Sequence, residues 1–365
     1  MQLSPIRVLV VDDSLVMRSL LRMVLASEPA IELAGMATDG VHALEAIERL
    51  KPDLVLLDIE MPRMNGIEVL TELRARHSPV KIIMCSTLTR RGARITLEAL
   101  ARGATDYVTK PTAQNGAANA VVTLSRDLLP RIKALFLQVP SPVTLGLPAS
   151  DEALHQKHAD VVVIGVSTGG PAALETLLPK LPAEFPVPIV VVQHMPQLFT
   201  AMLAERLDRE CALAVREAAP AMHPEAGTVY IARGDWHLEF VRLAFGNGHA
   251  LRLSQAAPEH FCRPSVDVLF RSAAQSYGDA VIGIVLTGMG SDGLEGCRAI
   301  RRAGGRVLVQ DRATSAVWGM PAVVAQAGLA HRTLPLPAIA AELQRLCPAR
   351  IPVASPKGWF AHAVH

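Results

Sequence analysis

The sequence lacks the features that mark several common protein classes. It has five cysteines in 365 residues, an odd number at wide spacings and without a C-x-x-C pair. This pattern argues against a disulfide framework or a zinc site and predicts a reducing cytosol. No apolar run reaches the roughly 18–20 residues of a membrane-spanning helix, and residues 1–5 show no secretory signal pattern. We therefore expect a soluble, cytoplasmic protein without membrane insertion.

Charge of one sign is also missing. The formal net charge is +2, and the nearest thing to a basic stripe is the short cluster Arg90, Arg91 and Arg94. A cluster of that length is typical of a solvated helix face. Because nucleic-acid binders usually carry an extended basic surface, we expect no nucleic-acid partner. The length is enough for two ordinary domains, each with its own core.

Residues 6–138 alternate short apolar runs with longer helical patterns. The runs are rich in β-branched residues and leucine without clean polar alternation, as expected for strands buried on both faces. The strand candidates are Val8–Val11, Ile31–Met36, Leu54–Leu57, Lys81–Cys85 and Tyr107–Thr109. Alternating strands and helices predict a doubly wound parallel sheet. We assign residues 1–125 to this domain and 126–157, with a helix at Val121–Leu137 and a Pro-rich stretch, to the connection.

A second α/β pattern begins at Asp160. Its strand candidates are Val161–Val166, Pro188–Gln193, Thr228–Ala232, Ala280–Leu286 and Arg306–Val309. Val241–Leu253 instead has the pattern of an antiparallel hairpin that turns at residues 246–248. We predict a Rossmann-like α/β domain over residues 158–350, with a mostly parallel sheet, and an irregular tail over 351–365.

In the first domain, charged and hydroxyl side chains follow the predicted strands. Asp12 and Asp13 follow the first strand, Asp58 ends the third, and Ser86 and Lys110 follow the fourth and fifth. The carboxyl ends of parallel strands meet at one edge of a sheet, so these groups should gather there. Clustered carboxylates repel one another unless a cation joins them, and Mg²⁺ prefers oxygen ligands. Each aspartate taken singly could instead be a helix cap.

The segment Asp58-Ile59-Glu60-Met61-Pro62-Arg63-Met64-Asn65-Gly66 sharpens this prediction. It resembles the phosphoacceptor loop of response-regulator receiver domains, and the resemblance covers residues 6 to about 125. It implies a flavodoxin-like fold, phosphorylation of Asp58 with Mg²⁺ as cofactor, and a histidine kinase as phosphoryl donor. The remaining roles that it implies are an acidic metal pocket of Asp12, Asp13 and Asp58, switch residues Ser86 and Tyr107, and the pocket lysine Lys110. Thr87 replaces Ser86 if the strand register differs by one.

In the second domain, a serine, a histidine and an aspartate follow predicted parallel strands. Ser167 lies in Gly165-Val166-Ser167-Thr168-Gly169, His194 follows the next strand, and Asp292 lies in the glycine loop after Ala280–Leu286. Such a trio can activate a serine nucleophile, with an imidazole as base and a carboxylate that orients it. The G-x-S-x-G spacing is typical of a nucleophile elbow. The N–H groups of Thr168 and Met289 are candidates for stabilising an oxyanion.

Several alternatives stay open on the residues alone. The serine loop could hold a phosphate, although it lacks the Gly-Lys-Ser/Thr ending of a P-loop. A generic α/β-hydrolase orders its triad serine, acid, histidine, which would use His331 with Asp235 or Asp292. A DNA-binding output or an inactive adaptor is a third class, but no basic helix-turn-helix pattern is present in residues 158–350.

Taken together, the motifs of the second domain resemble the chemotaxis protein-glutamate methylesterases over about residues 158–345. The motifs that carry the resemblance are Gly165–Pro171, Gln193–Pro196, Arg263–Phe270, Thr287–Gly293, Gln310-Asp311 and Gly319–Pro321. The resemblance implies Ser167 as nucleophile, His194 as general base and Asp292 as orienting carboxylate, with no cofactor for ester hydrolysis. It implies methylated chemoreceptors as substrates and a possible glutamine deamidase activity.

The chain departs from that family at a few positions. Arg233 and Trp236 stand where proline and a small or basic residue are usual, and Trp318 stands where phenylalanine is common. None of these belongs to the predicted triad. A receiver beside an exposed active site also suggests autoinhibition, in which the receiver covers the serine until Asp58 is phosphorylated.

Overall fold

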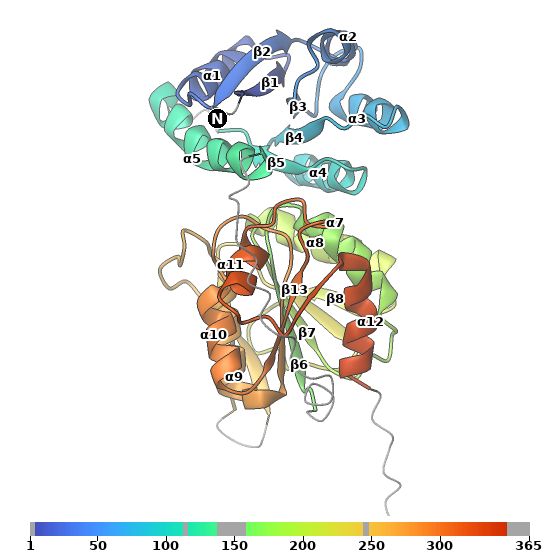
Figure 1. Cartoon of the computed structure of the whole chain (residues 1–365), viewed down its shortest axis with the longest axis vertical. Helices are drawn as coiled ribbons and strands as arrows, with labels where there is room; N and C mark the ends of the chain where they lie inside the picture. The colour runs from blue at the N-terminus through green and yellow to red at the C-terminus, as the bar shows by residue number, and fades with distance from the viewer. Residues whose placement is uncertain (1–3, 112–115, 137–157, 244–247, 349–365) are drawn as a thin grey trace, which may run out of the picture.

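The structure is a computed structural model that describes residues 4–111, 116–136, 158–243 and 248–348. It contains two α/β domains, one above the other in Figure 1. The predicted hairpin turn falls partly on residues 244–247, and the predicted connection and tail fall largely on 137–157 and 349–365, which lie outside the described residues. Among the described residues, none of the helices has the length and apolar character to cross a bilayer.

The N-terminal domain is a five-stranded parallel sheet with the strand order β2-β1-β3-β4-β5. Its elements are β1 (Ile6–Val11), α1 (Leu15–Ala26), β2 (Ile31–Ala37), α2 (Gly40–Leu50), β3 (Leu54–Asp58), α3 (Gly66–Ala75), β4 (Lys81–Ser86), α4 (Arg90–Ala101), β5 (Asp106–Thr109) and α5 (Gly116–Phe136). Every residue of β3 is buried, as the unbroken apolar run predicts. The doubly wound flavodoxin-like fold is confirmed.

Polar N-cap residues mark the starts of helices α1, α2 and α3, which follow the strands or loops of this domain. The side chain of Ser14 accepts a hydrogen bond from the backbone of α1, and Asp39 does the same for α2. Asn65 begins α3 with a reciprocal capping box to Glu68. Asn65 is thus a helix cap outside the acidic pocket. Helix α5 runs through the predicted boundary at residue 125 and packs against α1.

The C-terminal domain is built on a seven-stranded sheet in which every pairing is parallel, in the order β14-β13-β12-β6-β7-β9-β8. Its elements are β6 (Val161–Val166), α7 (Gly170–Leu177), η2 (Leu178–Lys180), β7 (Ile189–Gln193), α8 (Gln197–Glu210), β8 (Ala214–Glu217), β9 (Thr228–Ile231), β10 (His237–Arg242), β11 (His249–Ser254), α9 (Val266–Tyr277), η3 (Gly278–Ala280), β12 (Val281–Val285), α10 (Leu294–Arg302), β13 (Arg306–Gln310), α11 (Met320–Gln326), β14 (Arg332–Leu334) and α12 (Leu336–Leu346). Strands β10 and β11 form the expected antiparallel hairpin.

The strand order has its switch point between β6 and β12. From β6 the chain continues to β7 on one side, whereas β12, β13 and β14 occupy the other side. Open parallel sheets bind their ligands at such a switch point, outside the carboxyl ends of the strands. The loops that carry Ser167 and Asp292 leave β6 and β12 at this edge.

The two domains pack against each other through α4 and β5 of the first and α7 and α8 of the second, as Figure 1 shows. The rings of Tyr107 and Phe199 are stacked across this contact, with centroids 4.7 Å apart. Met289 and Val317, from loops of the C-terminal domain, pack against the apolar cluster that contains the buried face of α5. The face of the C-terminal domain that meets the N-terminal domain therefore includes loops at the carboxyl edge of the seven-stranded sheet.

Candidate active site and phosphoacceptor site

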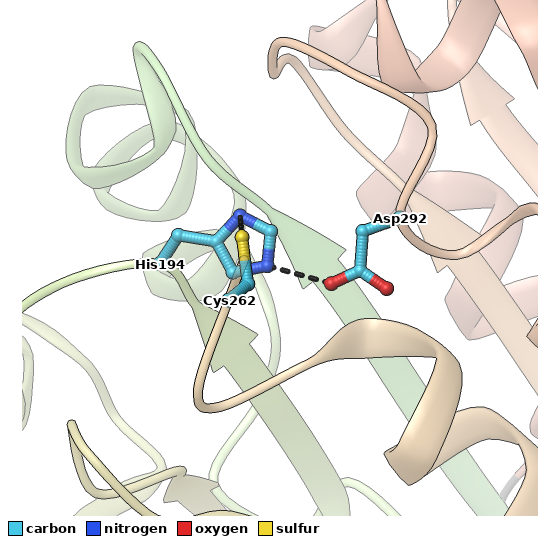
Figure 2. Close-up of side chains that lie close together, drawn as sticks. All are labelled: His194, Cys262 and Asp292. Atoms are coloured by element: carbon cyan, nitrogen blue, oxygen red, sulfur yellow. Dashed lines mark hydrogen bonds and ion pairs between the residues drawn. The ribbon is translucent and has the colours of Figure 1, made fainter. Parts of the chain in front are cut away.

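His194 and Asp292 form a hydrogen-bonded pair at the carboxyl edge of the seven-stranded sheet. His194 directly follows β7, and its Nε2 lies 2.8 Å from Oδ2 of Asp292 (Figure 2). The imidazole is 13% exposed and the carboxylate 3%. Because a carboxylate is the acceptor at Nε2, that nitrogen carries the proton, and Nδ1 is left to accept a proton from a substrate or a nucleophile.

The Asp292 carboxylate is held by the first turn of helix α9 as well as by His194. Oδ2 accepts the backbone N–H of Val266 at 2.8 Å, and Oδ1 accepts the N–H of Asp267 at 2.9 Å and the hydroxyl of Ser265 at 2.8 Å. A carboxylate from a distant loop thus satisfies the orphan donors at a helix start, where the helix dipole also favours negative charge. Four donors fix the orientation of the group that orients the imidazole.

These contacts shift the protonation equilibria of both partners. Burial alone would raise the pKa of Asp292, but the hydrogen bond from His194 and the backbone donors outweigh it and lower the pKa to about 2. Burial opposes protonation of His194, yet the hydrogen bond to Asp292 and the nearby Cys262 thiol raise the pKa of the imidazole above its usual value. The carboxylate therefore stays ionised and makes the imidazole a stronger base.

Ser167 lies beside this pair at the end of the neighbouring strand. The last residues of β6 and β7, Val166 and Gln193, are register partners, and the N–H of His194 donates to the carbonyl of Val166 at 3.2 Å. Ser167 and His194 are therefore equivalent positions on adjacent strands. On its other side, the N–H of Ser167 donates to the carbonyl of Thr287 at 3.0 Å. The structure thus brings all three residues of the predicted trio to one edge of the sheet.

The turn from β6 into α7 has the backbone that a nucleophile elbow needs. Gly169 has a φ of 77°, and a Cβ there would lie 2.6 Å from the Cβ of Ala316. Only glycine combines that conformation with so close a contact. A Cβ on Gly288 would lie 2.8 Å from the Cβ of Ser167, so the glycine loop after β12 approaches the serine closely. Thr168 follows Ser167 in the chain, and Met289 follows Gly288. Both predicted oxyanion donors therefore lie in segments next to the serine.

The alternative histidine lies at the opposite edge of the sheet. His331 Nδ1 accepts the N–H of Val307 at 3.0 Å, near the beginning of β13. His331 is thus at the amino end of β13, whereas Asp292 lies beyond the carboxyl ends of the strands, so the length of the strands separates the two. Asp235 pairs with Arg263 at 2.7 Å. The structure therefore contradicts a serine, acid, histidine order that uses His331.

In the N-terminal domain, the structure brings the predicted acidic groups and the lysine together. Lys110 Nζ lies 2.8 Å from Asp12 Oδ2 and 2.7 Å from Asp58 Oδ2. Oxygen atoms of Asp12, Asp13 and Asp58 lie within 4.8 Å of one another. Burial raises the pKa of Asp58 to about 6, although the ion pair with Lys110 acts in the opposite direction. A divalent cation would restore the ionised form, and three carboxylate oxygens at this spacing suit Mg²⁺.

The two predicted switch residues lie between this pocket and the other domain. Ser86 ends β4, and its hydroxyl lies 2.6 Å from that of Thr96 in α4. The hydroxyl of Thr87, the alternative switch residue, lies 3.3 Å from the hydroxyl of Thr89, the residue just before α4. Tyr107 is 6% exposed and stacks on Phe199 of α8. The tyrosine thus links β5 of the first domain to the second domain.

Three contacts near the site involve residues for which the sequence predicts no individual role. The Ser265 hydroxyl donates to Asp292, and in the sequence this serine is only one residue of the Arg263–Phe270 motif. Cys262 Sγ lies 3.7 Å from Nδ1 of His194 (Figure 2). Asp106, 3% exposed, accepts a 3.0 Å hydrogen bond from the Thr168 hydroxyl across the domain contact. No local pattern marks these residues, because each acts through a partner far away in the sequence.

Fold and site together define a class of protein: a phosphoacceptor domain joined to an α/β hydrolase domain with a serine, a histidine and an aspartate at its strand ends. Family comparison agrees with this class. Residues 8–121 match the response regulator receiver domain, and residues 162–343 match the CheB methylesterase. The chain belongs to the CheB methylesterase family and carries its receiver domain.

Relatives extend the match over more than nine-tenths of the chain. A protein-glutamate methylesterase/protein-glutamine glutaminase of a Nocardioides species is 50% identical over 95% of this chain and 98% of its own. One of Trichodesmium erythraeum is 45% identical over 93% and 98%. The crystal structure of the CheB methylesterase catalytic domain of Thermotoga maritima is 42% identical, covers 52% of this chain and all of its own, and has a TM-score of 0.50.

Proposed function

We propose that this enzyme hydrolyses methyl esters on glutamate side chains of chemoreceptors and releases methanol, which gives adaptation in chemotaxis-type signalling. The relatives named protein-glutamate methylesterase/protein-glutamine glutaminase support the substrate class. The observation that carries the chemistry is the His194–Asp292 pair, 2.8 Å apart, at the strand end next to Ser167.

The mechanism follows from the roles proposed for the three residues. Nδ1 of His194 accepts the proton of the Ser167 hydroxyl as Oγ attacks the ester carbonyl, and Asp292 stabilises the imidazolium. The N–H groups of Thr168 and Met289 would stabilise the oxyanion. Collapse of the tetrahedral intermediate breaks the bond to methoxide, which takes the proton from His194 and leaves as methanol. Water, deprotonated by the same imidazole, then hydrolyses the acyl-enzyme.

The same residues can deamidate glutamine. Both reactions pass through one glutamyl-serine ester, and they differ only in whether methanol or ammonia leaves. Protonation of the leaving group matters more for ammonia, because an amide nitrogen is a poor leaving group without a proton. The imidazolium that forms when His194 takes the serine proton can supply that proton, and the relatives' double name supports the second activity.

For the receiver, we propose Asp58 as the residue that accepts a phosphoryl group from a chemotaxis histidine kinase. Asp12, Asp13 and Asp58 would hold Mg²⁺, which neutralises charge during phosphoryl transfer. Lys110, between Asp12 and Asp58, would pair with the phosphoryl oxygens. Ser86 and Tyr107 would rearrange in response, and Tyr107 already contacts the catalytic domain.

We further propose that the unphosphorylated receiver inhibits the esterase. Asp106 of the receiver binds the side chain of Thr168, the residue after the nucleophile, and Met289 of the glycine loop packs on the receiver cluster. A protein substrate must reach the same edge of the sheet. Phosphorylation of Asp58 would open this contact by moving β5 and α4.

Receptor methanol release with and without phosphorylation tests both parts. We expect slow release by the unphosphorylated chain and faster release once Asp58 is phosphorylated. A fragment that starts near His158 should be active without phosphorylation. Equal activity of this fragment and the unphosphorylated full chain would contradict autoinhibition and leave the esterase assignment intact.

A further inference from the structure

A thiol lies on the nitrogen of His194 that faces away from Asp292. Cys262 Sγ is 3.7 Å from Nδ1, while Nε2 is bound to Asp292, so the imidazole lies between a sulfur and a carboxylate (Figure 2). Neither the thiol nor the histidine is fully buried. Ester hydrolysis as derived above does not use the thiol.

The loop that carries Cys262 holds the thiol in place. Backbone hydrogen bonds join Glu259 and Cys262 in both directions, at 2.8 and 3.1 Å, and close a tight turn. The turn residues His260 and Phe261 have φ values of 50° and 62°, a conformation that non-glycine residues rarely adopt. An ion pair between Glu259 and Arg271 and a 3.1 Å hydrogen bond between His260 and Asp267 anchor the turn to α9. The thiol is thus positioned before any ligand arrives.

The spacing of sulfur and nitrogen matches that of two ligands on one soft metal ion. Zinc binds thiolate sulfur at about 2.3 Å and imidazole nitrogen at about 2.0–2.1 Å, and a tetrahedral angle then separates the two ligand atoms by about 3.6 Å. The separation of Cys262 Sγ and His194 Nδ1 is 3.7 Å. The distance between the two atoms therefore fits a zinc ion that binds both.

Asp292 completes the arrangement without binding the metal itself. Histidines that bind zinc usually donate their other ring N–H to a carboxylate, which fixes the ring and strengthens the ligand. His194 has this partner already at Nε2, and four donors hold the carboxylate. The group proposed to orient a general base would equally orient a metal ligand.

A second cluster of three such groups, His260, Asp267 and Asp292, lies nearby and is less suited to a metal. Its carboxylates already accept hydrogen bonds: Gly296 donates to Asp267 Oδ1 at 2.6 Å, and Asp292 accepts four donors. Binding a cation there would break these contacts. This leaves the sulfur–nitrogen pair as the better site.

We propose that Cys262 Sγ and His194 Nδ1 form a binding site for a thiophilic divalent cation such as Zn²⁺, with Asp292 as the outer carboxylate. An ion bound there occupies the nitrogen that must accept the serine proton, so it inhibits hydrolysis reversibly. This inhibition rests on the proposed role of His194, whereas binding of the metal does not. Two protein ligands leave the other coordination positions to water, which suits an ion that binds and leaves.

Cobalt(II) absorption tests the site without reference to activity. The full chain is titrated with Co²⁺ in excess Mg²⁺, so that Mg²⁺ fills the carboxylate pocket of the receiver. We expect a thiolate-to-cobalt charge-transfer band in wild type and in Cys211→Ser, the matched control, since Cys211 is the other half-buried cysteine. The band should vanish in Cys262→Ser and weaken in His194→Gln. A wild type without the band, or a Cys262→Ser variant that keeps it, would overturn the site.

Inhibition is measured in parallel as methanol release against Zn²⁺ concentration. Loss of an outer carboxylate partner alone typically lowers metal affinity about 10–100-fold. Loss of the thiolate should therefore raise the inhibitory Zn²⁺ concentration at least about tenfold in Cys262→Ser, while a chelator restores wild type. Equal inhibition of both proteins would overturn the proposal. A cobalt band in a chain that releases no methanol from any receptor would instead count against the esterase assignment and leave the metal site standing.

Discussion

The hydrogen bond between Thr168 and Asp106 gives a direct way to weaken the domain contact. Thr168 Oγ1 donates to Asp106 Oδ2 at 3.0 Å, and both residues are buried. Thr168→Val removes this donor while it keeps the size of the side chain and the backbone N–H. Asp106 retains Arg131 at 2.7 Å and the N–H of Tyr107, so its charge stays paired.

The expected effect follows from that remaining pairing. A hydrogen bond to a charged group contributes roughly 1.5–3 kcal/mol, and the lower end applies here because Asp106 keeps two donors. A loss of about 1.4 kcal/mol changes an equilibrium constant tenfold. If the unphosphorylated chain is mostly closed, Thr168→Val should raise its rate of methanol release about tenfold. The phosphorylated chain, already open, should change little.

The assay compares methanol release from methylated receptor by both proteins, with and without phosphorylation. Thr176→Val is a matched control, because this threonine of α7 donates only to the carbonyl of Ala172 in its own helix. A basal rate of Thr168→Val equal to that of wild type would refute the role of the contact in inhibition. An equal fall in both phosphorylation states would show that the threonine hydroxyl takes part in the chemistry.

Three further predictions concern the triad and the receiver. Because the pKa of His194 is raised and its neutral form is the base, kcat/KM of the phosphorylated enzyme should increase with pH through an apparent pKa above 6.5. Asp292→Asn should move this apparent pKa downward and lower kcat by about 10⁴-fold. An unchanged pH profile in this variant would refute the pairing. Ser265→Ala removes one of four donors to Asp292, a loss of about 1 kcal/mol, so kcat/KM should fall about fivefold with KM unchanged; a change confined to KM would contradict a positioning role. Asp58→Asn should keep the basal rate and lose activation by a small-molecule phosphoryl donor, whereas activation of this variant would place the phosphoacceptor elsewhere.

Much of this architecture could be predicted because the decisive groups follow buried strands. Apolar runs such as Val161–Val166 identify the strands, and the residue after each run then falls at the carboxyl edge of the sheet. This rule alone places His194 beside Ser167 and Asp58 beside Asp12. The receiver phosphoacceptor loop and the serine loop are also contiguous motifs, which a reader can find without knowing the fold.

Other elements could not be predicted because their signals are short or distant. Strands β8 and β14 have four and three residues and are partly exposed, so they lack the apolar run of a central strand. Ser265 and Cys262 contact the triad only through tertiary structure, because Asp292 and His194 lie 27 and 68 residues away from them in the sequence. The stacking of Tyr107 on Phe199 joins two domains, and no periodicity within either one reports it.

The central claim is that Ser167 is the nucleophile of a protein-glutamate methylesterase. The measurement that tests it most directly is methanol release from methylated chemoreceptor by the phosphorylated chain, with Ser167→Ala compared to wild type. The account predicts release by wild type and its loss in the variant, without loss of the fold. Equal release by both proteins would contradict the assignment of the nucleophile, and no release by wild type from any receptor would contradict the proposed substrate.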